Sequence, residues 1–285
     1  MRLRISLVVA ALSGFNALSY EIVWYRVLAI MTGGVAASFG LLLAAYLLGL
    51  AIGARVSSAW CREAESRARV LRPLAVFVAV ANVIAALVIP AFAWSAKFTD
   101  YRVGLGMVAI GAAFLGAVFP LVSHFGIDPD DRAGARLSYL YLANILGSAA
   151  GSLFTGFVLM DLLSLGSLAR LLNVFGFALA VAIAVLDRER GSVASRRYRL
   201  VGVLGAVATF AVWLSPRLHD RVYERLVYKD EYDESKRFAQ IIENRSGVIT
   251  VTDQGTVYGG GAYDGVLNTA LENNERNVIV RAYLA

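Results

Sequence analysis

The sequence predicts an α-helical integral membrane bundle of about seven transmembrane helices, followed by a small antiparallel β segment. Its composition is the first reason: 58% of the 285 residues are hydrophobic, 17% are charged, and the mean hydropathy is +0.63. Soluble domains carry about 25% charged residues, so this composition excludes an ordinary soluble enzyme and a disordered chain. The second reason is a series of long apolar runs, and the third is a two-residue hydrophobic period near the C-terminal end.

The apolar runs predict the helices in order. A membrane helix needs about 20 mostly apolar residues to cross about 30 Å of hydrocarbon. Seven stretches reach or approach that length: residues 5–30, 35–53, 74–95, 103–124, 138–160, 168–186 and 200–215. The last of these stretches is the short one. The first run is too long for a cleaved signal peptide, and it carries Glu21 and Arg26 where a small-residue cleavage site should follow.

Basic residues in the loops predict the orientation, because cytoplasmic loops carry an excess of Lys and Arg. One side holds 14 of them: Arg2, Arg4, Arg55, Arg62, Arg67, Arg69, Arg72, Arg132, Arg136, Arg188, Arg190, Arg196, Arg197 and Arg199. The other side holds Lys97, Arg102 and Arg170. We therefore expect the N-terminus in the cytoplasm. Seven full crossings would leave the tail outside, whereas one incomplete or re-entrant run would leave it in the cytoplasm.

Charge and residue counts exclude three further classes. The net charge of +6 comes from residues in short loops between apolar runs, so it indicates orientation signals rather than nucleic-acid binding. Cys61 is the single cysteine, which excludes a disulfide scaffold. We predict no metal site, because His124 has no second His or Cys at ligand spacing.

Two glycine pairs predict close helix packing. The glycines of each pair are four residues apart, a spacing that places both on one helix face. The pairs are Gly49 with Gly53 and Gly147 with Gly151. Without side chains on that face, a neighbouring backbone can approach closely. Packing inside the bundle is the favoured interpretation, and a homo-oligomer contact is the alternative.

Three polar residues stand out in or near the predicted spans. Glu21 is an acidic residue well inside an apolar run, where a carboxylate must face protein, water or a partner. It is interpreted either as a proton or cation site, or as a structural anchor to a neighbouring helix. Arg26 lies five residues further on and is offset around the helix, which disfavours a direct pair with Glu21. The amide of Asn144 is suited to bridging helices.

We predict three segments: a transmembrane domain (1–215) and a polar tail that consists of an amphipathic linker (216–237) and a small β segment (238–285). Residues 238–244, 248–252 and 256–258 are expected to form an antiparallel sheet of two or three strands. The glycine-rich stretch that follows is interpreted as a flexible turn rather than a phosphate-binding loop, because Walker spacing is lacking. An uncapped helix start near residue 278, after so small a sheet, indicates that the chain is incomplete.

Several segments resemble the membrane region of bacterial spermidine-synthase-like proteins: residues 19–26 (SYEIVWYR), 38–55 (SFGLLLAAYLLGLAIGAR), Phe119-Pro120-Leu121 and 139–147 (YLYLANILG). In that family a multi-helix membrane region is fused to a spermidine-synthase-like α/β domain. Residues 245–265 (RSGVITVTDQGTVYGGGAYDG) resemble its small β-domain, and 277–285 (NVIVRAYLA) resemble the helix that leads into its nucleotide-binding sheet. The resemblance covers nearly the whole chain and implies the bacterial inner membrane.

The resemblance also implies a reaction, the transfer of an aminopropyl group from decarboxylated S-adenosylmethionine to a putrescine-like polyamine. The glycine loop and the catalytic aspartate would lie beyond residue 285, so we expect no catalytic residue and no cofactor site in this chain. Tyr263, Asp264 and Asn268 are the expected substrate-binding residues. Soluble members usually continue the Asp-Gly pair with Gln, whereas Val266 stands there in this sequence.

The sequence is also consistent with two other functions. The chain is either a membrane anchor or assembly module without catalysis, acting through its glycine faces, or a small transporter or channel for polyamines or other cations. In the transporter hypothesis Glu21, Asn82 and Asn144 would line a polar path.

Overall fold

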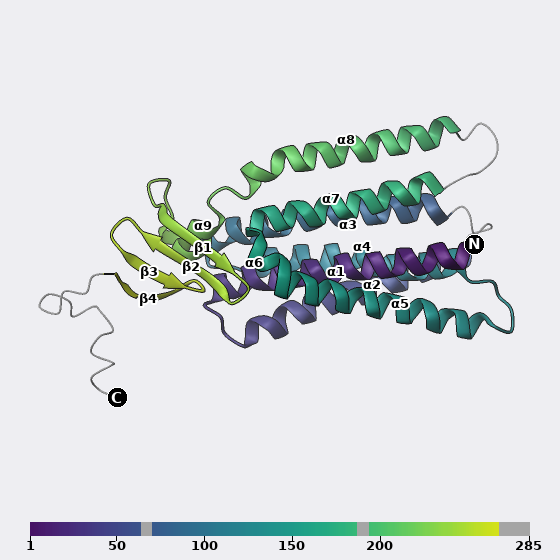
Figure 1. Ribbon diagram of the computed structural model, residues 1–285, viewed down its shortest axis with the longest axis horizontal. Coiled ribbons are helices and arrows are strands. Elements are labelled where there is room, and N and C mark those ends of the chain that lie inside the picture. Colours follow the sequence, from purple (N-terminus) through teal and green to yellow (C-terminus); the bar gives the residue numbers. More distant parts are fainter. Residues whose placement is uncertain (64–69, 187–193, 268–285) are drawn as a thin grey trace, which may run out of the picture.

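The computed structural model describes residues 1–63, 70–186 and 194–267, which form a helical bundle with a small sheet at one end (Figure 1). Seven helical segments within these residues are long and apolar enough to cross a membrane, judged by length and composition. The long helices are α1 (Arg2–Thr32), α2 (Ala37–Glu63), α3 (Leu71–Ser95), α4 (Arg102–Gly126), α5 (Ala133–Phe154), α7 (Leu165–Leu186) and α8 (Ala194–Leu218).

Helix α1 is the centre of the bundle and contacts α2, α3, α4, α5 and α7. It begins at the end of the bundle far from the sheet and ends beside the sheet (Figure 1). Helix α8 lies at the edge, against α7 and α3. It has 25 residues and continues through Pro216, so the last helix is longer than the apolar run that predicted it.

Small residues set the spacing between the two closest helix pairs. A Cβ atom added to Gly49 or Gly53 would overlap the backbone of α4, and one added to Gly147 or Gly151 would overlap the backbone of α1. Such direct backbone contact is the geometry that small residues at this spacing permit. Both glycine pairs therefore face partners within the same chain. The carbonyl groups that they face belong to Ala109, Ala113, Ala11 and Phe15, respectively.

Helix α5 does not run straight into the next element. A π-helical turn at Thr155–Leu159 and a short helix α6 (Met160–Leu162) extend it to the sheet end of the bundle. The hydroxyl of Thr155 donates a hydrogen bond to Ser19 of α1 (2.8 Å), and Ser19 donates in turn to the carbonyl of Gly151 (3.3 Å). Single π-turns inside α-helices are frequent at functional sites, and this one lies beside the sheet.

A turn with Arg221 at φ 51° separates α8 from the short helix α9 (Val222–Tyr228). Val222 and Leu226 of α9 are buried in the same hydrophobic cluster as Trp24 of α1 and Phe92 of α3. Two 3₁₀ turns, Ala96–Phe98 and Lys229–Glu231, contact each other and both contact α9. The linker segment is thereby packed onto the end of the bundle.

The sheet is a four-stranded antiparallel meander in the order β1-β2-β3-β4. Its strands are β1 (Phe238–Asn244), β2 (Gly247–Thr252), β3 (Thr256–Gly259) and β4 (Ala262–Val266). The sequence predicted two or three strands, so the fourth corrects that expectation. The stretch interpreted as a flexible turn is a tight hairpin, in which Gly259 pairs with Ala262. Gly260 and Gly261 have φ values of 57° and 89°, the two positive values that a two-residue hairpin turn favours.

The glycine contacts lead to a test of the bundle. Gly147→Leu would force a side chain into the backbone of α1, and overpacking of this kind costs about 1–3 kcal/mol. Gly134→Leu on the same helix meets nothing within 4 Å and is the matched control. We expect the first variant to unfold at a lower temperature in detergent and the second to match the parent protein. Equal melting temperatures for both variants would contradict the close approach of α5 and α1.

Candidate functional site

The end of β1 is where the sheet is fastened to the bundle. The Glu243 carboxylate accepts a hydrogen bond from the backbone N–H of Leu165 (2.7 Å), the first residue of α7. The backbone N–H of Arg245 donates to the carboxylate of Asp161 in α6 (2.7 Å), and the Arg245 guanidinium pairs with the same carboxylate (3.5 Å). An acidic group at a helix N-terminus satisfies a free N–H group and complements the helix dipole.

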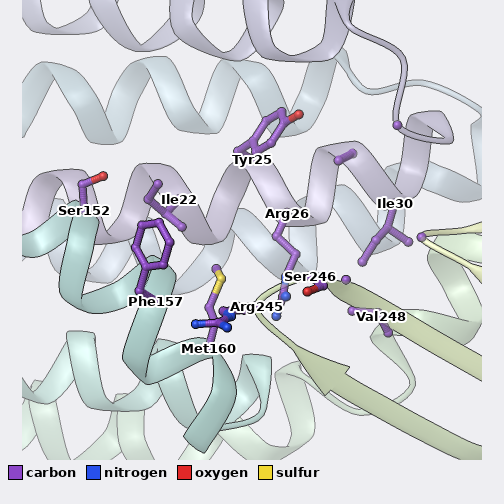
Figure 2. Close-up of a pocket in the computed structure, with 15 residues that line it drawn as sticks. Ile22, Tyr25, Arg26, Ile30, Ser152, Phe157, Met160, Arg245, Ser246 and Val248 are labelled. Carbon is purple, nitrogen blue, oxygen red and sulfur yellow. The ribbon is translucent and has the colours of Figure 1, made fainter.

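Arg26 of α1 supplies the third contact. Its guanidinium donates a hydrogen bond to the backbone carbonyl of Asn244, and only 9% of the residue is exposed. No carboxylate of the described residues forms an ion pair with it, Glu21 included. Three consecutive residues, 243–245, are thus held by three helical elements of the bundle. The same guanidinium faces a cavity of about 480 Å³ (Figure 2).

That junction cavity lies between α1, the π-turn after α5, and the turn from β1 to β2. Figure 2 shows Ile22 and Phe157 at the end toward the middle of the bundle, and Ser246 and Val248 at the end toward the sheet. Arg26 reaches from α1 toward Ser246. The cavity therefore has an apolar inner end and a polar end with Arg26 near the sheet, and the Arg245 guanidinium lies between them beside Met160 (Figure 2).

A second cavity of about 310 Å³ lies on the other side of the β1 end. Tyr223, Glu224 and Glu243 line it together with His219. Burial, with the neighbouring Glu243 carboxylate as a smaller cause, raises the pKa of Tyr223 well above its usual range. The tyrosine therefore stays protonated at neutral pH and contributes no charge to this cavity.

His219 connects α8 to this second cavity. Its Nδ1 atom lies 2.8 Å from the Ser215 carbonyl, which only accepts, so Nδ1 carries the proton. The Nε2 atom is buried and has no hydrogen-bond partner among the residues that the structure describes. Burial, and to a lesser degree the charge of Arg170, lowers the pKa of His219. The imidazole is consequently neutral at pH 7.

The polar residues predicted inside the spans are not brought together. Glu21 is buried and has no hydrogen bond or ion pair among the described residues, and it lies near Tyr46 of α2. Asn144 lines a separate cavity of about 230 Å³, where its backbone carbonyl faces Gly14 of α1. No hydrogen bond from the Asn144 amide to another helix is present within the part of the chain that the structure describes.

A different amide network bridges the helices. Asn16 and Tyr20 of α1 both donate to the Asn82 side-chain oxygen on α3, at 3.1 and 3.0 Å. Asn173 of α7 donates to the Asn82 backbone carbonyl (2.7 Å), and the Asn82 amide donates to Val78 one turn earlier (2.7 Å). Asn82 thus uses its polar groups inside the bundle. Sequence reasoning did not single out Asn173, which is one polar residue in an apolar run.

The predicted substrate-binding residues lie elsewhere. Tyr263 and Asp264 are exposed on the edge strand β4, where the Tyr263 ring packs against Tyr258. Neither lines the two cavities at the junction. Asn268 lies outside the described residues. The assignment of these residues to substrate binding therefore stays a prediction.

The side chains at the junction are suited to binding a ligand. Among the described residues, no group of three His, Cys, Asp or Glu is placed to hold a metal ion. The junction instead offers two guanidinium groups beside an apolar wall, and, in the second cavity, carboxylates already engaged by backbone N–H groups. Comparisons with protein-family models, with curated proteins and with solved structures give no match.

The role of Glu243 can be measured directly. Glu243→Ala removes the acceptor at the first turn of α7, and the loss of such a cap costs about 0.5–2 kcal/mol. We expect faster hydrogen exchange at Leu165 and along β1, whereas Gln240→Ala, at an exposed position of the same strand, leaves exchange unchanged. Unchanged exchange in both variants would mean that this contact does not hold the sheet.

His219 leads to a pH prediction. Because its pKa is lower in the folded than in the unfolded protein, the unfolded chain binds more protons as the pH falls below about 6.5. The stability associated with neutral His219 is present above that pH and is lost on acidification. We expect the melting temperature to fall less in His219→Gln than in the parent between about pH 7.5 and 5. His124→Gln, at the other histidine of the sequence, is the control, and identical pH profiles of His219→Gln and the parent would refute the assignment.

Proposed function

We propose that this chain is a multi-pass protein of the bacterial inner membrane whose helical bundle anchors the small sheet at the extracytoplasmic face. The observation that carries the proposal is the position of the N-terminus at the end of the bundle opposite the sheet (Figure 1). An odd number of crossings separates the two, since seven candidate spans lie between them. A cytoplasmic N-terminus therefore requires an extracytoplasmic sheet.

The distribution of charge supports this orientation. The N-terminus and the connections between spans on the N-terminal side carry eight arginines of the described residues, more than the connections between spans at the sheet end, which favours the cytoplasm for the N-terminal side. These eight arginines are Arg2, Arg4, Arg55, Arg62, Arg72, Arg132, Arg136 and Arg199. The connections between spans at the sheet end carry Lys97, Arg102 and Arg170, and residues 217–229, at and after the end of the last span, add Arg217, Arg221, Arg225 and Lys229.

An anchor is favoured over a transporter because the buried polar groups serve the architecture of the bundle. The hydrogen bonds of Asn82 are formed with α1, with α7 and with its own helix α3. Asn144 lines a cavity whose described lining residues include neither Asn82 nor Glu21. The sheet, by contrast, is fastened by residues 243–245 to three helical elements, which suits a protein that presents an extramembrane domain in a fixed position.

A second candidate is the membrane-embedded N-terminal portion of a spermidine-synthase-like protein. The four-stranded antiparallel sheet favours it, because the sequence resemblance places the small β-domain of that family in this segment. Its donor, decarboxylated S-adenosylmethionine, and a putrescine-like acceptor are cytosolic, so this candidate requires a cytoplasmic sheet. The two candidates therefore differ in one measurable property.

Cysteine labelling tests the orientation. Cys61 is the single cysteine, so Cys61→Ser gives a background for single-cysteine variants. Gln254→Cys lies in the exposed turn between β2 and β3, and Asp131→Cys lies in the exposed loop between α4 and α5 at the other end. We expect a membrane-impermeant maleimide to label Gln254→Cys in intact spheroplasts, and Asp131→Cys only after lysis.

The opposite pattern would overturn the proposed orientation and leave the synthase-like candidate standing. Labelling of both positions in intact spheroplasts would contradict seven crossings, because it would place the two ends of the bundle on one side. Recovery of the protein in the soluble fraction would contradict membrane insertion itself.

A further inference from the structure

We propose that the junction cavity between α1, the π-turn and the β1–β2 turn binds the phosphate headgroup of an anionic phospholipid. The chemistry required of the ligand is a phosphate next to an apolar tail. The proposal rests on the membrane insertion proposed above, which the cysteine labelling tests independently.

Charge is the first argument. Arg26 and Arg245 line the cavity, and none of the described residues lining it is an aspartate or a glutamate. The Arg245 guanidinium pairs with Asp161 outside this lining (3.5 Å), so Arg26 supplies the uncompensated charge. The buried guanidinium of Arg26 has a backbone carbonyl as its acceptor and no carboxylate partner among the described residues. A buried cation without a counter-ion is costly, so an anion in the cavity would be strongly favoured. Guanidinium groups match the geometry of phosphate oxygens, which they can contact through two parallel hydrogen bonds.

Depth is the second argument. Helix α1 has 31 residues, which corresponds to about 46 Å and exceeds the hydrocarbon core of about 30 Å. Arg26 lies six residues before Thr32 at the end of this helix, or about 9 Å from it. In a bilayer centred on α1, Arg26 is thus near the boundary between hydrocarbon and headgroups, where lipid phosphates lie.

The arrangement of the lining residues is the third argument. The cavity runs from Ile22 and Phe157 at its inner end to Arg26 and Ser246 near the sheet (Figure 2). Arg245 lies between these ends, beside Met160 (Figure 2). The order of Ile22 and Phe157 toward the middle of the bundle and Arg26 toward its end matches the order of acyl chain and headgroup in a bilayer leaflet. Phe157 is 61% exposed on the outside of the bundle, beside other exposed apolar residues of the same segment. They are Leu153, Phe154 and Val158.

The π-turn itself contributes space. Gly156 lies in this turn and lines the cavity, and a Cβ atom added to it would meet nothing within 4 Å. A side chain can therefore start from this position, at the wall of the cavity, without an overlap at its Cβ atom. This makes Gly156→Leu a blocking variant that retains both arginines.

The test is a lipid titration of the full chain purified in detergent, followed by native mass spectrometry. The probes are dioleoylphosphatidylglycerol, dioleoylphosphatidylcholine and inorganic phosphate. We expect phosphatidylglycerol to bind most tightly, and we expect Gly156→Leu and Arg245→Gln each to weaken it about tenfold. Gly106→Leu meets open space on α4, and Arg237→Gln removes an exposed charge outside the cavity, so both should keep the parent affinity.

Three results would overturn the proposal. The first is equal affinity for phosphatidylcholine, which would show that the arginine residues do not select the headgroup. The second is parent-like binding of phosphatidylglycerol in both Gly156→Leu and Arg245→Gln, provided that both variants retain the parent melting temperature. The third is complete displacement of the lipid by inorganic phosphate at equal concentration, which would assign the cavity to a free anion. If either variant misfolds, Arg26→Lys is tested in its place, because lysine keeps the positive charge but cannot form bidentate hydrogen bonds with a phosphate.

Discussion

The sheet depends on the attachment of residues 243–245 to the bundle. A small antiparallel sheet is marginal in water unless it packs against another element, and this one exposes much of β1 and β4. The junction stabilises it, because Glu243 caps α7, Asn244 accepts from Arg26 and Arg245 contacts Asp161. At the other end of β1, the Phe238 ring stacks on Tyr228, the last residue of α9 (5.3 Å between ring centroids). Val248 adds an apolar contact, since it is buried in the same cluster as Trp24 of α1. The contacts that position the sheet on the bundle thus also stabilise it.

The bundle can provide a rigid platform because its own contacts are short and specific. Glycine pairs bring α2 onto α4 and α5 onto α1 at backbone distance, so small shifts of these helices would produce overlap. The amide network around Asn82 adds directional bonds between α1, α3 and α7. Since α1 takes part in both arrangements and also carries Arg26, a movement of α1 would be transmitted directly to the end of β1.

The helices and the glycine contacts were predictable because each depends on a local pattern: an apolar run of sufficient length, or two glycines four residues apart. The fourth strand was missed because Gly260 and Gly261 suggested flexibility, whereas their positive φ values build a tight hairpin. The junction was not predictable, because Arg26 and Asn244 are 218 residues apart and no periodic pattern relates them. Arg26 was singled out as a polar residue in a span, but its partner is a backbone carbonyl. Every residue has a backbone carbonyl, so the sequence does not indicate which of them accepts the hydrogen bond.

Arg26 explains why the attachment and the cavity coincide. A guanidinium has five N–H donors, and the Asn244 carbonyl engages only part of that capacity. Burying the group to hold β1 therefore leaves donors and a positive charge directed at the space beside the strand. An anion in that space would contact both α1 and the β1–β2 turn, and any ligand that binds only the docked arrangement stabilises it by mass action. The residue that fastens the sheet is thus the residue through which a lipid phosphate would strengthen the attachment.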